Sequence, residues 1–172
     1  MGWKNIKQHY SILHIVHVRD DKILIGSPYV SDLLSIDQDC NVIRPHTHLG
    51  EGGDLTRIRR AMEGDRKKLR ELMVTPDTFG ELMTVYTFED DRIIEKQCEE
   101  IGFPNVTTDG ELMYDNSHFA KREQAIRHAK RNAAAIVSSI SENVERREAE
   151  LASMKADLAN WRGIAERLEA AS

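Results

Sequence analysis

The chain is poor in cysteine and aromatic residues and has no long hydrophobic run. Its two cysteines, Cys40 and Cys98, lie in unrelated segments without a Cys-x-x-Cys spacing, which excludes a disulfide scaffold and a cysteine-ligated structural zinc. The longest apolar run, residues 133–137, is too short to cross a bilayer, and the first ten residues lack the apolar stretch of a secretion signal. We therefore expect a cytoplasmic protein without a membrane contact.

An excess of positive charge is also absent. The 172 residues include 24 Lys and Arg against 29 Asp and Glu, a net charge of −5, which argues against general nucleic-acid binding. Hydrophobic residues make up 40% of the chain, which is enough for a core, and the length suits one domain with an extension.

What the sequence does contain is a long helical pattern from about Ser117 to Leu168, in which Gly163 is the only helix breaker. Its apolar residues recur mostly at alternating steps of three and four, the spacing of a coiled coil. We call the following residues the apolar stripe: Ile126, Ala129, Ala133, Ile136, Ile140, Val144, Leu151, Met154, Leu158, Trp161, Ala165 and Leu168. Some fifty residues would reach roughly 75 Å, longer than a compact domain built from the rest of the chain.

The apolar stripe therefore needs a second helix to cover it, most simply one from another copy, which predicts a homo-oligomer. The residues expected to hold the copies together are the larger members of the stripe: Ile136, Ile140, Val144, Leu151, Met154, Leu158, Trp161 and Leu168. Near Ser138–Ser141 two successive apolar steps are four residues long. This irregularity predicts either a local unwinding of the supercoil or a fold-back of the helix.

Residues 1–116 predict an α+β head, and residues 117–170 predict the coiled-coil helix. Alternating apolar residues over 11–43 are typical of an antiparallel β-meander with a turn at Asp20-Asp21. A helix is expected over 54–74, where Asp54 is a plausible N-cap and Thr75-Pro76 ends the pattern.

The segment 82–115 predicts a strand, a helix and a hairpin in that order. The strand covers 82–88, and the helix covers 90–101 because Gly102 and Pro104 follow as helix stops usually do. Asp109-Gly110 is the strongest hairpin signal in the chain. Asn116 or Ser117 is then expected to cap the long helix.

A loop rich in histidine and glycine, residues 44–53, admits two kinds of site. His46 and His48 form a His-x-His pair followed by carboxylates, which could hold a metal ion, and PHTHLGEGGD superficially resembles the His-x-His strand of metal-dependent hydrolases. This resemblance implies a hydrolase or phosphodiesterase, although the further ligands of that family are not found here. The alternative is a solvated polar loop.

The same loop could instead bind a phosphate or a nucleotide signal. Gly50, Gly52 and Gly53 lead into a helix N-terminus, which favours anions, and Arg57 follows one turn later. The spacing matches neither the P-loop nor the dinucleotide fingerprint, and the carboxylate of Asp54 would repel an anion. An ordinary loop entering a capped helix explains the same residues, so we expect no cofactor.

Charge of each sign is concentrated in separate segments. The basic residues expected to contact a partner are Arg57, Arg59, Arg60, Arg66, Lys67 and Arg70, and the acidic ones are Glu89, Asp90 and Asp91. Aromatic residues do not interleave with the basic run as they do in single-strand binding platforms. Pairing of the two faces within or between copies, or steering toward a protein partner, is therefore expected ahead of direct nucleic-acid binding.

Two runs, HIVHVRDDKILIGSPYVSDLLSI and TTDGELMYDNSHFAKREQAIRHAKRNA, resemble small accessory proteins encoded by bacteriophages and other mobile elements. The resemblance covers about half the chain and carries no catalytic residue with it. It implies a protein of the host cytoplasm that binds or blocks a host protein or nucleoprotein complex, including the anti-CRISPR type of inhibitor. No serine or cysteine has a convincing nucleophile context, so we expect an interaction protein rather than an enzyme.

Overall fold

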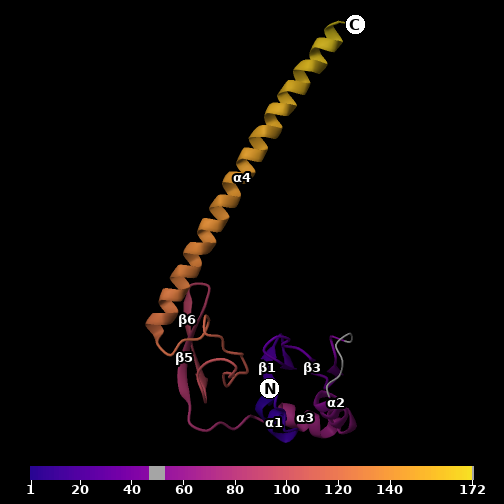
Figure 1. Ribbon diagram of the computed structural model, residues 1–172, viewed down its shortest axis with the longest axis vertical. Coiled ribbons are helices and arrows are strands. Elements are labelled where there is room, and N and C mark those ends of the chain that lie inside the picture. The colour runs from indigo at the N-terminus through magenta and orange to yellow at the C-terminus, as the bar shows by residue number, and fades with distance from the viewer. Residues whose placement is uncertain (47–52, 172) are drawn as a thin grey trace. The chain divides into compact units, whose positions relative to one another are not determined.

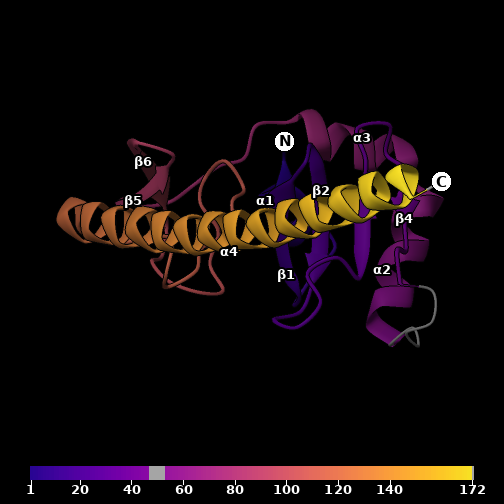
Figure 2. The same ribbon diagram turned by 90° about the horizontal axis from the view of Figure 1, so that it is seen from above.

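The computed structural model describes residues 1–46 and 53–171, and it has the α+β composition expected from the sequence. The chain divides into two units, Met1–His128 and Ala129–Ser172, each described by itself below. Figures 1 and 2 show the strands and short helices of the first unit and the single long helix that continues through the second.

A four-stranded antiparallel meander in the order β1-β2-β3-β4 forms the sheet of the first unit, as predicted. The strands are β1 (Ile15–Arg19), β2 (Lys22–Gly26), β3 (Leu34–Ile36) and β4 (Val42–Ile43). Asp20 and Asp21 form the two-residue turn between β1 and β2 and adopt φ angles of 50° and 56°. Aspartate tolerates this left-handed conformation better than most residues, which explains why the chain reverses there.

Three helices bury the apolar face of the meander: α1 (Trp3–His9), α2 (Gly53–Gly64) and α3 (Arg66–Val74). The helix expected over 54–74 is thus two helices, because Asp65 interrupts it and accepts a hydrogen bond from the Lys68 N–H at 2.9 Å as the N-cap of α3. The largest fully buried side chains of this core are Ile6, Val16, Ile23, Ile25, Leu34, Ile36, Ile58, Met62 and Leu69.

The prediction of a helix over 90–101 is wrong. Residues Met83–Glu89 form β5 and Arg92–Cys98 form β6, and the two strands pair in register along their full length. The reversal is again a two-residue Asp-Asp turn, in which Asp90 has a φ of 52°. Gly102, which suggested a helix end, instead has a φ of 99° in an irregular turn where the Asn105 N–H donates to its carbonyl.

The hairpin expected around Asp109-Gly110 is reduced to a tight turn. Val106 and Leu112 make a single bridge rather than two strands. Gly110, at a φ of 97°, lies against β1, where its carbonyl accepts a hydrogen bond from the Val18 N–H at 2.7 Å. The turn thus joins the β5–β6 region to the meander.

Helix α4 (Arg122–Ala170) begins later than the predicted caps Asn116 and Ser117. The Ser117 hydroxyl donates to the Tyr114 carbonyl rather than to a helix N–H, and Phe119 exchanges two backbone hydrogen bonds with Tyr86 of β5. The backbone around Phe119 is therefore held by the sheet edge, and the helix forms only after it.

Candidate functional site

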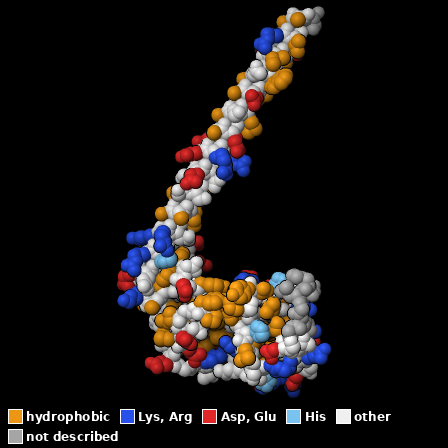
Figure 3. Space-filling view, viewed as in Figure 1, with side chains coloured by type: hydrophobic (Ala, Val, Ile, Leu, Met, Phe, Trp, Pro, Cys, Tyr) orange, Lys and Arg blue, Asp and Glu red, His pale blue; other side chains and the backbone are white. Residues whose placement is uncertain are grey.

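The apolar stripe leaves a row of large hydrophobic side chains exposed along α4. α4 is one continuous helix of 49 residues, so the fold-back considered for Ser138–Ser141 does not occur. In the single chain, the eight large stripe residues keep between 47% and 66% of their surface exposed: Ile136, Ile140, Val144, Leu151, Met154, Leu158, Trp161 and Leu168. Figure 3 shows these apolar positions recurring along the helix between charged side chains.

A shallow groove lies on α4 at the place where the apolar steps become four and four. Ile140, Val144 and Leu151 supply its apolar floor, and it is bordered by Asn143, Arg147 and Glu148. Arg147 pairs with Glu150 at 3.6 Å on the same helix. Between Ile140 and Leu151 the stripe is therefore apolar at both ends and is interrupted by the polar residue Arg147, which we call the polar break.

The predicted basic surface on α2 and α3 is partly neutralised by neighbours. Arg57 pairs with Asp54 at 2.8 Å, Arg59 pairs with Glu63 at 3.2 Å, and Arg66 donates to the Asn41 side chain at 2.8 Å. The Asn41 amide is uncharged, so four of the six basic residues form no ion pair within the described residues, and all four are exposed: Arg60, Arg66, Lys67 and Arg70.

The predicted acidic residues lie at the tip of the β5–β6 hairpin, not on a helix. Glu89 ends β5, and Asp90 and Asp91 form the turn. All three are exposed, and none of them forms an ion pair with any residue that the structure describes. The tip thus exposes three carboxylates, and the basic residue opposite them in the strand pairing is Arg92, the partner of Glu89.

His46 contacts a carboxylate that the sequence did not suggest. Its Nε2 lies 2.9 Å from Oδ1 of Asp32, which comes from the segment before β3. His48 and Gly50, like Gly52, lie outside the described residues. Among residues 1–46 and 53–171, no group of three or more His, Cys, Asp or Glu side chains is arranged to hold a metal ion.

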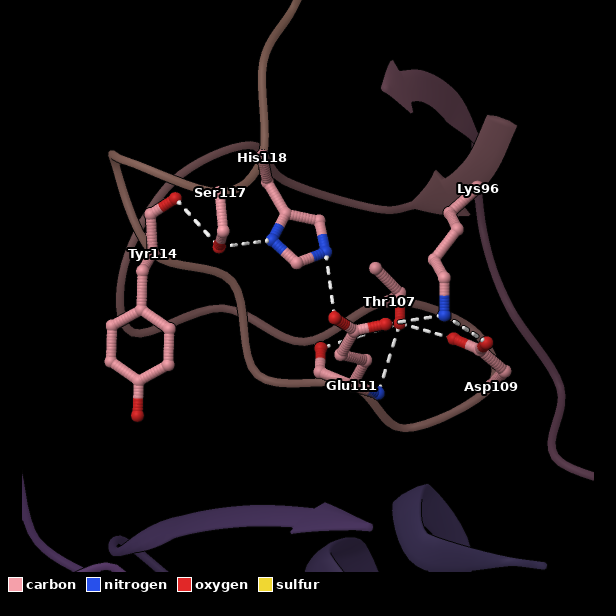
Figure 4. A network of polar contacts seen from close by, with 7 residues as sticks. All are labelled: Lys96, Thr107, Asp109, Glu111, Tyr114, Ser117 and His118. Carbon is pink, nitrogen blue, oxygen red and sulfur yellow. Dashed lines mark hydrogen bonds and ion pairs between the residues drawn. The ribbon is translucent and has the colours of Figure 1, made fainter. Parts of the chain in front are cut away.

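A polar network that the sequence did not reveal ties β6 to the turn over 107–111 (Figure 4). The Lys96 ammonium lies 2.6 Å from Asp109 Oδ2 and also pairs with Glu111. The Thr107 hydroxyl donates to the Asp109 carboxylate and accepts the Glu111 N–H at 2.9 Å. Burial alone would lower the pKa of Lys96, but these two acidic partners outweigh it and raise the pKa above its ordinary value.

His118 completes the network beneath the surface. Its side chain is only 1% exposed, with Nδ1 at 2.9 Å from the Ser117 hydroxyl and Nε2 at 3.5 Å from a Glu111 oxygen. Serine and carboxylate thus flank one imidazole, but they occupy the opposite ring nitrogens from those of a hydrolytic triad, and the ring is almost completely buried. The network fastens the turn and the segment before α4, and we assign it a structural role.

The buried imidazoles make stability depend on pH. Burial lowers the pKa of His118 and that of His17, so both rings are neutral in the folded state at pH 7. A lowered pKa stabilises the fold above about pH 6.5, and the benefit is lost as the pH falls below that value, because the unfolded chain then binds protons more readily.

We expect the free energy of unfolding to decrease from pH 7.5 to pH 5.5, with each of the two buried histidines adding a slope of up to about 1.4 kcal/mol per pH unit. Urea titrations of the unmodified chain and of His118→Gln at both pH values measure this. The variant should be less stable at pH 7.5 but should lose about half of the pH dependence. An unchanged slope would show that His118 does not titrate differently in the two states.

Comparisons with known proteins returned no relative: no family model, no curated protein and no solved structure matches the chain. Within the described part of the chain, no helix combines the length and apolar character needed to span a membrane.

Proposed function

We propose that this chain is a non-enzymatic interaction protein that self-associates through the apolar stripe and presents its first unit to a second macromolecule. The observation that carries the proposal is the row of eight large apolar side chains, each about half exposed, along one face of a 49-residue helix. Monomeric proteins rarely leave so much contiguous apolar surface in water, and a second helix with the same spacing covers it best.

We propose that this chain contacts its partner through exposed charged side chains. The acidic hairpin tip of Glu89, Asp90 and Asp91 forms no ion pair among the described residues, and Arg60 and Lys67 offer a separate basic surface. Charges of this kind accelerate association with a complementary partner and discriminate against others. The resemblance to phage accessory proteins supports a bacterial host protein or nucleoprotein complex as that partner, in the host cytoplasm, with inhibition as the outcome.

The self-association is tested by the mass of the full chain in solution. We expect light scattering to give about twice the chain mass of 19.6 kDa at micromolar concentrations, with dissociation on dilution. The thermal transition of the helical signal should also rise with protein concentration, because association stabilises the folded helix by mass action. A mass of one chain at all concentrations up to about 100 μM would refute the proposal.

A further inference from the structure

We propose that the second copy lies parallel to the first copy and in register with it along α4. The inference rests on the proposed self-association and adds the direction of the partner helix. Four charged residues that border the apolar stripe carry it: Glu150 and Asp157 on one side, Lys155 and Arg162 on the other. All four are exposed, and Figure 3 shows side chains of both signs beside the apolar positions of α4.

The spacing of these charges fits a partner helix better than their own helix. Glu150 precedes Lys155 by five residues, and Asp157 precedes Arg162 by five. Side chains of one helix meet when they are three or four residues apart, so neither pair closes within a chain. With Leu151 and Leu158 at heptad position a, Glu150 and Asp157 occupy position g, and Lys155 and Arg162 occupy position e. In a parallel two-stranded coiled coil, a g residue faces the e residue five positions later on the partner helix, so both pairs are attractive. Symmetry repeats each pair on the other side of the dimer.

An antiparallel arrangement brings like charges together. When the whole stripe overlaps itself in that direction, the dimer centres on Arg147, Lys130 comes beside Arg162, and Glu148 comes beside its own copy. Each of these contacts is repulsive, and a flanking charge pattern of this kind sets helix orientation in coiled coils. Arg147 faces Arg147 in both orientations and does not discriminate between them.

The groove on α4 favours the in-register alignment. It places a polar break, centred on Arg147, between the apolar residues Ile140 and Leu151. When the two helices are in register, the polar break of one copy faces the polar break of the other, and each large apolar residue faces an apolar residue. Glu148 of the second copy then lies beside Arg147. A shift by one heptad would instead bury Arg147 opposite Met154 of the second copy, without a counter-charge.

Two variants of the full chain, each with one added cysteine, test the orientation. Ile136→Cys and Leu158→Cys are purified separately, mixed to exchange subunits, and oxidised gently. In the parallel dimer each new cysteine faces its own copy, whereas the positions 136 and 158 are about 33 Å apart along the axis. We expect disulfides between like variants and fewer than one tenth as many between unlike ones. The unmodified chain is the control, since Cys40 and Cys98 are buried and should not cross-link.

A charge reversal with rescue provides a second readout. Lys155→Glu should raise the dimer dissociation constant roughly tenfold, and adding Glu150→Lys in the same chain should restore it. Glu145→Lys, on the outer face of the helix, is the matched control and should change it less than twofold. Sedimentation equilibrium measures all four chains.

The outcomes separate the two proposals. A dimer with like-variant disulfides and rescue supports the parallel arrangement. A dimer that yields chiefly disulfides between unlike variants overturns it and leaves the self-association intact. A chain that stays monomeric in sedimentation overturns both.

Discussion

Replacing Leu151 and Leu158 together by aspartate is expected to convert the proposed dimer to single chains at micromolar concentration. Both residues lie in the apolar stripe and are about half exposed in the single chain. Burial of a leucine contributes about 1.5–3 kcal/mol, and an unpaired buried carboxylate costs several kcal/mol more. The summed free-energy cost of the four substitutions in a dimer exceeds the ~8 kcal/mol that corresponds to a micromolar dissociation constant.

The matched control carries the same added charge on the other side of the helix. Ser153→Asp with Asn160→Asp lies two residues beyond each leucine and outside the stripe, so the mass by light scattering should stay that of two chains. Circular dichroism of both variants reports whether α4 remains helical. Two chains per particle in the leucine variant would mean that the stripe is not the interface.

Gly110→Ala is expected to destabilise the first unit by about 3 kcal/mol or more. Its φ of 97° is a conformation that alanine adopts with strain, and an added Cβ would lie 2.3 Å from Val18 Cγ2 and 2.7 Å from Val18 Cβ. The turn cannot withdraw without losing the hydrogen bond from the Val18 N–H to the Gly110 carbonyl. Urea unfolding followed by tryptophan fluorescence measures the loss.

Gly102→Ala separates backbone strain from the contact with β1. Gly102 has nearly the same φ, 99°, but no heavy atom lies within 4 Å of an added Cβ. We expect a cost of only about 1–2 kcal/mol from strain. Equal losses in the two variants would show that the turn does not dock against Val18 in solution.

The meander was predictable because the residues that specify it lie close together in the sequence. Alternating apolar residues and the Asp20-Asp21 turn specify it within a few residues. The same signal was present in the second hairpin, since VRDDKILI and FEDDRIIE share the Asp-Asp turn and the apolar residues after it. Glycine and proline after residue 101 suggested a helix end and obscured that likeness, although Ile93 and Ile94 favour a strand.

Other features depend on residues distant in sequence and could not be predicted. The backbone N–H groups of Lys4 and Asn5 donate to the Asp77 carboxylate, at 3.2 and 2.8 Å, so α1 is capped by a residue more than seventy positions away. The network of Lys96 with Asp109 and Glu111 likewise joins a strand to an irregular turn. The apolar stripe, in contrast, follows from the helical period alone, which is why its exposed face could be anticipated.

Under the proposed self-association, the continuity of α4 links the lifetime of the protein to its abundance. Its second half makes few contacts beyond its own turns, and helices without tertiary packing are only marginally stable in water. A single chain is therefore expected to carry a fraying end that proteases cut readily, and in the proposed dimer the second copy would cover this end. We then expect the protein to be degraded when it is scarce and to persist when it is abundant, so that the expression level sets a threshold for the accumulation of the proposed dimer.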